Sequence, residues 1–312
     1  MTRPKLSQAS SGFGGRGYRA IFEPGQPTVM SITTALSAID VPGLRNWERQ
    51  QVAAFAVTHL DQIAAKDEEV AYRYLMAVPK FLTPEKHDEL DPELDVWNAA
   101  EYALNEAANA GTWIHQYIED HLLGRFTDPI YRDDHFQMAE AFHAWEAEHD
   151  IEVLSTERTV FGDRYAGTAD LFAKVDGVVT LIDWKSSKAV RDSHIGQLAA
   201  IGAAHTSARE VPEGTEGAVY HKIQPKVAAE HDGQVDSWWV EEPLPDFQQY
   251  AVVQVRPEDY DARGEVIDAF CEMHVIPQNR IEAGYQLFTA ARDVRLAQRE
   301  MKLAEKESWD GS

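Results

Sequence analysis

One stretch of the chain decides the fold: YAGTADLFAKVDGVVTLIDWKSSK, which spans residues 165–188. Two largely apolar runs, 168–175 and 178–184, flank the dipeptide Asp176-Gly177, which favours a tight turn. We therefore predict two consecutive strands that form a hairpin. A hairpin pairs its strands antiparallel, so a purely parallel, doubly wound sheet is disfavoured.

Charged side chains occupy one end of this hairpin. Asp170 opens the first strand, and Asp183 and Lys185 close the second, so antiparallel pairing would bring the two carboxylates together. Residues two apart in a strand share a face, so Asp183 and Lys185 point the same way. Oxygen-rich clusters of this kind suit Mg²⁺ or Mn²⁺. Gly167 lacks a side chain, which would let a bulky substrate approach the backbone.

The triplet Asp183-x-Lys185 is also compatible with a purely structural role, because such triplets at strand ends usually form solvated salt bridges. The preceding run, residues 178–182, favours the functional interpretation. It is an apolar strand that ends abruptly in charge, as expected where a buried strand delivers functional groups to a sheet edge.

Alternating helical and strand patterns surround the hairpin. A strand at 151–161 precedes it, and we expect helices at 98–123, 134–148, 193–204 and 265–305 and further strands at 217–223, 235–241 and 249–256. This order predicts an α/β fold with a central mixed β-sheet flanked by helices.

Composition excludes several classes of protein. The chain has 312 residues, 44% of them hydrophobic, which is enough for a substantial core. Its single cysteine, Cys271, excludes an internal disulfide and an iron–sulfur cluster held by this chain's cysteines. The chain contains neither a membrane-spanning run nor the apolar segment of a signal peptide. We therefore expect no membrane partner.

The net charge of −23 argues against a broadly basic DNA-binding surface. The charge is unevenly distributed, however. Residues 1–60 carry six lysines and arginines against three aspartates and glutamates. Carboxylates that hold a metal also add negative charge while serving phosphate chemistry. Weak, salt-dependent contact with DNA through the N-terminal segment is therefore compatible with the composition.

Five motifs, in order, resemble the RecB-like branch of the PD-(D/E)XK nucleases, which includes phage and CRISPR-associated exonucleases. They are Gly111-Thr-Trp-Ile-His115, Glu157, Gly167-Thr-Ala-Asp170, Ile182-Asp183-Trp184-Lys185, and Gln197. The resemblance covers roughly residues 29–256. It implies a restriction-endonuclease-like PD-(D/E)XK core, preceded by a helical N-terminal region.

The resemblance also implies roles for the individual residues. His115, Asp170 and Asp183, with the Trp184 carbonyl, would hold Mg²⁺ or Mn²⁺, and Lys185 would be the catalytic lysine. Gln197 would help to position the site or the DNA. Two alternatives stay open for Glu157, which either supports the site or is an ordinary exposed strand residue. His115 taken alone would be a histidine on a helix face.

Two features of the family's pattern are missing. The tyrosine that the family places after Gln197 falls at Ile201, and several relatives carry four cysteines for an iron–sulfur cluster. The domain organisation that follows has four parts: a flexible N-terminal arm (1–28), a helical N-terminal region (29–109), the PD-(D/E)XK nuclease core (110–256) and a helical C-terminal tail (257–312).

The resemblance implies a metal-dependent DNA exonuclease that acts on single- or double-stranded ends in recombination, repair or replication. We expect it in the cytoplasm of a bacterium, with a phage gene as one source. A structure-specific endonuclease would share every motif. A catalytically silent DNA-end-binding accessory protein, which would work with a recombination partner protein, is a different class. A module whose acidic face binds basic proteins is supported by net charge alone.

Overall fold

The structure is a computed structural model, and it describes residues 3–10, 13, 15–39, 42–64, 99–125, 129–261 and 263–310. The chain divides into two compact units, Met1–Ile39 with Gly111–Ser312, and Asp40–Ala110. The smaller unit contains α2 (Pro42–Thr58), α3 (Leu60–Ala64) and the start of α6 (Ala99–Leu122). The region predicted to be helical, 29–109, is thus helical over much of its described length. Its residues 65–98 lie outside the described ones.

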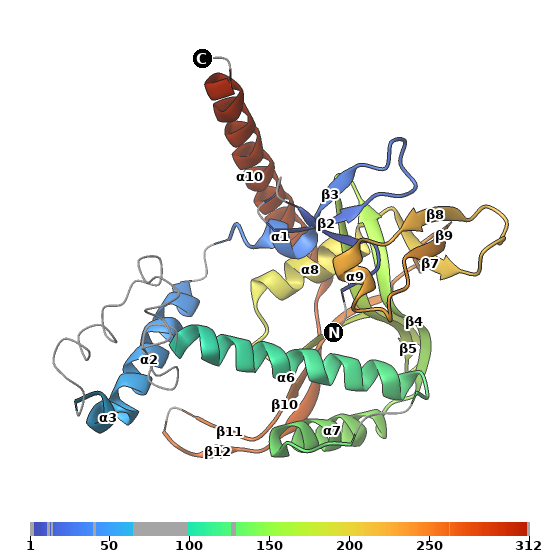
Figure 1. Ribbon diagram of the computed structural model, residues 1–312. Helices are drawn as coiled ribbons and strands as arrows, with labels where there is room; N and C mark the ends of the chain where they lie inside the picture. The colour runs from blue at the N-terminus through green and yellow to red at the C-terminus, as the bar shows by residue number, and fades with distance from the viewer. Residues whose placement is uncertain are drawn as a thin grey trace. The chain divides into compact units, whose positions relative to one another are not determined.

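The larger unit is built on a mixed sheet of eleven strands among the described residues. The predicted hairpin is its centre: β5 (Tyr165–Val175) pairs antiparallel with β6 (Val178–Lys185) and, on its other edge, with β4 (Ile151–Gly162). Strand β10 (Gln249–Arg256) then joins β6 in parallel. Figure 1 shows β4 and β5 running side by side in this sheet. The predicted α/β organisation with a mixed sheet is confirmed.

The turn of the central hairpin has the expected chemistry. Asp176 and Gly177 both have positive φ, 52° and 82°. Two-residue turns of this kind match the right-handed twist of the strands, and aspartate followed by glycine tolerates the required backbone best. The dipeptide therefore fixes the register in which β5 and β6 meet.

The N-terminal segment 1–28 is not the predicted arm. It forms β1 (Ser7–Ser10) and β2 (Gly15–Arg19), and β3 (Thr28–Ser31) follows. These strands extend the sheet beside β5, and Leu6 and Tyr18 are fully buried there. The glycine- and serine-rich composition hid two short strands, because only a few of their residues supply the buried contacts.

The other side of β4 carries β7 (Thr206–Val211), β9 (Asp236–Glu242) and β8 (Val219–Lys222) in that order. A short helix, α9 (Pro225–Ala228), lies between β8 and β9 in the chain. Residues from β2, β3, β4, β5, β7 and β9 share one apolar core, which includes Tyr18, Phe161 and Trp239. The N-terminal strands β2 and β3 and the strands β7 and β9 therefore pack around a common core.

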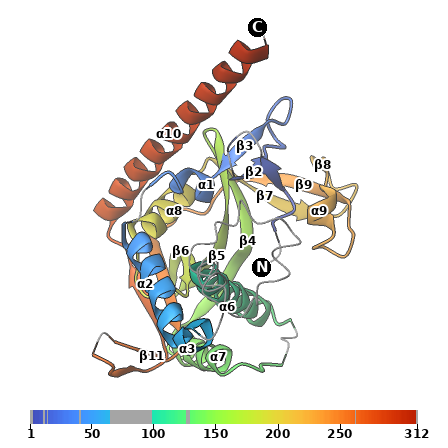
Figure 2. The same ribbon diagram turned by 60° about the vertical axis from the view of Figure 1, so that its left-hand side comes forward.

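Helices cover both faces of the central strands. On one face, α1 (Ile32–Leu36), α8 (Asp192–Gly202) and α10 (Gln278–Asp310) contribute to the largest core cluster, and α10 runs beside α8 before it extends beyond it (Figure 2). On the other face, Phe142 and Trp145 of α7 (Asp133–Glu146) make edge-to-face contacts with Trp184. These layers bury β6 up to its last residues.

The C-terminal segment 257–312 is only partly the predicted helical tail. Strands β11 (Asp259–Tyr260), β12 (Val266–Ile267) and β13 (Phe270–Val275) precede α10, and β13 pairs antiparallel with β10. The predicted start of the helix, at residue 265, is therefore thirteen residues too early. None of the helices in the described parts of the chain has the length and apolar character needed to cross a membrane.

Candidate active site where β5 and β6 separate

The sheet opens at the predicted carboxylates. The edge of β5 that faces β6 pairs with β3 at Tyr165 and Ala166 and with β6 from Leu171 onward. Among the described residues, 167–170 have no partner strand on this edge. The ladder between β5 and β6 ends at the pair Leu171 and Ile182. Its register, extended by one residue, places Asp170 opposite Asp183. Two carboxylates therefore face a gap in the ladder instead of a continuous sheet.

Asp183 is an almost fully buried carboxylate, with 1% of its side chain exposed. Lys185 Nζ lies 2.6 Å from its Oδ2, but neither Asp183 oxygen has a hydrogen bond of acceptable geometry. Burial raises the pKa of Asp183 to about 6, Lys185 opposes this shift, and Asp170 adds to it. The pair is buried, so it differs from the solvated salt bridge that the triplet alone would suggest.

Asp170 is held by the main chain of the neighbouring strand. The Trp184 backbone N–H donates to Asp170 Oδ2 at 2.9 Å, which fixes the orientation of the carboxylate. Burial raises the pKa of Asp170, while Lys185 and the Trp184 N–H lower it. The carboxylate is thus both desolvated and oriented, as a metal ligand or a catalytic group requires.

His115 reaches the same carboxylate from α6. Its Nδ1 lies 3.5 Å from Asp170 Oδ2 and is buried without a hydrogen-bond partner of acceptable geometry. Burial lowers the pKa of His115 to about 4, and the charge of Lys185 adds to the effect. A hydrogen bond between the ring and the Trp184 main chain opposes it. At neutral pH the imidazole is therefore uncharged and keeps a lone pair for a ligand.

Glu157 continues the row of carboxylates onto β4. Its neighbours Thr156 and Arg158 pair with Leu171 and Ala169, so the register places Glu157 opposite Asp170. Burial, Asp170 and Glu119 together raise the pKa of Glu157 to about 9. Its φ of 45° is unusual for a non-glycine residue in a strand. The alternative of an ordinary exposed strand residue does not fit this environment.

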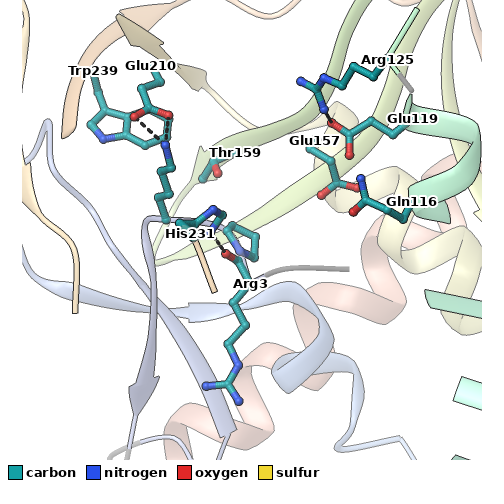
Figure 3. A pocket seen from close by; sticks show the side chains of 11 residues that line it. Arg3, Gln116, Glu119, Arg125, Glu157, Thr159, Glu210, His231 and Trp239 are labelled. Carbon is teal, nitrogen blue, oxygen red and sulfur yellow. Dashed lines mark hydrogen bonds and ion pairs between the residues drawn. The ribbon is translucent and has the colours of Figure 1, made fainter. Parts of the chain in front are cut away.

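A cavity of about 310 Å³ adjoins Glu157 (Figure 3). Glu157, Gln116, Glu119 and Arg125 gather on one side of it, as Figure 3 shows, while Glu210 and Trp239 lie on the other. Its basic groups are paired with acids: Arg125 with Glu119 at 3.4 Å, and Lys5 with Glu210 at 2.8 Å. The cavity thus places paired cations beside the carboxylate row.

Gln197 and Ile201 lie one turn apart on α8 and line a second, much smaller cavity together with Gly167 and Thr168. This places Gln197 against the segment of β5 that leads to Asp170. The sequence suggested that Gly167 lets a substrate approach the backbone, but the structure gives this glycine a different role. A Cβ there would collide with Ile32 Cδ1, so the glycine allows α1 to pack closely on β5.

Two features escaped the sequence analysis. His194 lies near Lys185, and burial and the charge of Lys185 lower its pKa to about 3. Among the described residues, His121, His143 and Glu146 form a group whose potential ligand atoms all lie within 4.8 Å of one another. The sequence signal that could have revealed this group is the three-residue spacing of His143 and Glu146, which places both on one face of the predicted helix 134–148. His121 lies on the predicted helix 98–123.

No protein-family model matches the chain, and no curated protein matches it. The functional interpretation therefore depends on the geometry of the row Glu157–Asp170–Asp183 and of the groups around it.

Proposed function

We propose that the protein is a metal-dependent DNA exonuclease with a PD-(D/E)XK core. The observation that carries the proposal is the convergence of His115, Asp170, Asp183 and Lys185 at the point where β5 and β6 separate. Two carboxylates, a neutral imidazole and an ammonium meet there, and the exposed fraction of their side chains ranges from 1% for Asp183 to 17% for Lys185. Burial of this many ionisable groups is costly for stability and is typical of functional sites.

The donor groups fit a divalent cation. Asp183 Oδ1 and His115 Nδ1 are buried without a hydrogen-bond partner, while Asp183 Oδ2 faces the Lys185 ammonium at 2.6 Å. Buried polar atoms without a protein partner are rare, and ions or ordered waters commonly satisfy them. Carboxylates dominate the set, and they suit Mg²⁺ or Mn²⁺. Bound by His115, Asp170, Asp183 and the Trp184 carbonyl, such a cation would lower the pKa of a water and offset charge on the phosphodiester.

Lys185 and Glu157 would work beside the cation. The Lys185 ammonium is positively charged, like a metal ion, so it cannot be a ligand of that ion. Its ammonium is held within 2.6 Å of Asp183, where it can orient the attacking water or stabilise charge on the phosphoryl oxygens. Glu157, whose pKa is raised to about 9, keeps its proton at neutral pH. A neutral carboxyl does not repel a phosphate and can donate a hydrogen bond to it.

The cavity beside Glu157 is where we propose that a DNA strand enters. Arg3 lines it with Lys5 and Arg125, and Arg3 is also paired, at 3.4 Å from Glu230. Phosphates would have to displace these carboxylates from the basic groups. DNA binding should therefore be weak and strongly salt-dependent, in keeping with the net charge of −23.

A catalytically silent DNA-end-binding protein is the second candidate. Ile201, where the resembled family has tyrosine, is 1% exposed and belongs to the main apolar core, so it cannot contact DNA. Loss of that contact would weaken a nuclease. The silent alternative gives no reason, however, to bury Asp170 and Asp183 opposite each other beside Lys185.

Digestion of end-labelled DNA tests these possibilities together. Single- and double-stranded substrates, labelled at the 5′ or the 3′ end, are incubated with the full chain in Mg²⁺, Mn²⁺ or EDTA. An exonuclease releases mononucleotides or short products progressively from one end, whereas an endonuclease first yields internal fragments. Binding to DNA ends without any product in either metal would support the silent alternative.

A further inference from the structure

A second cluster of metal-ligating side chains lies between α6 and α7. His121 is near the end of α6, and His143 and Glu146 are one turn apart on α7. His121 Nε2 lies 2.9 and 3.0 Å from the two Glu146 oxygens, and His143 Nδ1 lies 3.3 Å from Glu146 Oε2. The two imidazole rings stand 4.5 Å apart at 70°. Three donors from two helices thus surround one small space.

These spacings suit a metal ion. Ligands at ~2.0–2.2 Å from a tetrahedral Zn²⁺ lie a little over 3 Å from one another. The three side chains are between 28% and 40% exposed, so an ion can enter and a water or a fourth ligand can complete its coordination. Two imidazoles and one carboxylate favour Zn²⁺ and related transition metals over Mg²⁺. The donor set therefore differs in kind from the carboxylate-rich set at Asp170 and Asp183.

A neighbouring hydroxyl orients one of the imidazoles. Tyr117 Oη lies 2.8 Å from His143 Nε2, on the far side of the ring from Nδ1. When His143 Nε2–H donates to this oxygen, Nδ1 carries the lone pair that a metal requires. Metal-binding histidines generally donate their other ring N–H to such a partner. A surface histidine in an ordinary ion pair has no need of this arrangement.

We propose that His121, His143 and Glu146 bind a transition metal of the Zn²⁺ class, which crosslinks α6 to α7. The site is separate from the proposed nuclease centre and does not depend on it. His121 follows His115 by six residues on the same helix, a rise of ~9 Å. The crosslink would hold the segment of α6 that presents His115.

Titration with the metal alone tests the proposal. We would use the full chain carrying Asp183→Asn, so that the carboxylate-rich site does not compete. Zn²⁺ is titrated by calorimetry and Co²⁺ by its visible absorption at pH 7.5. The cluster variants are His143→Gln and Glu146→Gln. The matched control is His149→Gln, because His149 is also paired with a carboxylate, Asp176, at 2.8 Å but has no second histidine in that pair.

The proposal predicts one Zn²⁺ per chain and a Co²⁺ spectrum typical of low coordination number. Each cluster variant should weaken Zn²⁺ binding by more than ~10-fold, and Tyr117→Phe by ~10-fold, the usual cost of losing a supporting hydrogen bond. His149→Gln should leave binding unchanged. Thermal melts in EDTA show whether each variant is folded, and either cluster variant suffices for the test. The proposal would be overturned if both cluster variants bound Zn²⁺ as tightly as the parent chain, or if the parent chain did not bind Zn²⁺.

Discussion

Replacement of Asp183 by asparagine tests whether burial of its charge destabilises the fold. The pKa of Asp183 is about 6 in the folded chain, against ~3.9 in an unfolded chain. Each pKa unit corresponds to ~1.36 kcal/mol, so the ionised carboxylate destabilises the fold by roughly 3 kcal/mol above pH 6. Asparagine removes the charge and keeps the shape. It also leaves Lys185 without its closest partner, so ~3 kcal/mol is an upper limit for the gain.

The sign of the pH dependence follows from the raised pKa. The penalty of Asp183 is present above its folded pKa and disappears as pH falls and the group becomes protonated. In metal-free buffer, Asp183→Asn should therefore melt at or above the wild-type temperature at pH 7.5. The difference should shrink toward pH 5. Asp176→Asn is the matched control, because Asp176 is an exposed aspartate and its pKa is lowered by hydrogen bonds from the Asp150 backbone and His149.

Chemical denaturation at pH 5, 6 and 7.5 in EDTA, repeated with Mn²⁺ at pH 7.5, provides the measurement. Wild type should gain stability from Mn²⁺, and Asp183→Asn should gain little. A large loss of metal-free stability in Asp183→Asn at pH 7.5 would refute the reasoning. It would mean that the Asp183–Lys185 pair is a stabilising structural salt bridge.

Three further predictions concern catalysis, packing and DNA contact. Lys185→Ala should retain Mn²⁺ and DNA binding but cleave ~10²–10³-fold more slowly in single-turnover assays, and near-wild-type cleavage would remove Lys185 from the active site. Gly167→Ala should lower the melting temperature because its Cβ meets Ile32, and Ile32→Ala in the same chain should restore part of the loss; no loss at all would contradict the packing role. Joint replacement of Arg3 and Lys5 by serine should weaken DNA binding and flatten its dependence on salt, and an unchanged salt slope would exclude both from DNA contact.

The central strands could be predicted from local sequence because their signals are local. The runs around Asp176-Gly177 are typical of strands, and the dipeptide fixes the turn, so Asp170 and Asp183 were expected opposite each other. Strand β13 was missed because it is only six residues long and directly precedes a long helical pattern. Its pairing with β10, which ends at Arg256, establishes it as a strand.

The site was predictable only where neighbours in sequence or a family motif define it. Gly167 was misinterpreted because its constraint comes from Ile32, which is far away in the chain. The raised pKa of Glu157 follows from its burial and from the charges of Asp170 and Glu119, on a neighbouring strand and on α6. Sequence alone contains the residues of such clusters but not the tertiary contacts that change their chemistry.

The most direct test of the account is DNA cleavage by wild type and Asp183→Asn, measured side by side in Mn²⁺ and in excess EDTA. Wild type should cleave DNA in Mn²⁺ only, and the variant should cleave in neither condition, although thermal melts should show that it is folded. Equal cleavage by wild type in Mn²⁺ and in EDTA, or wild-type rates from Asp183→Asn, would contradict the assignment of a metal-dependent nuclease to this site.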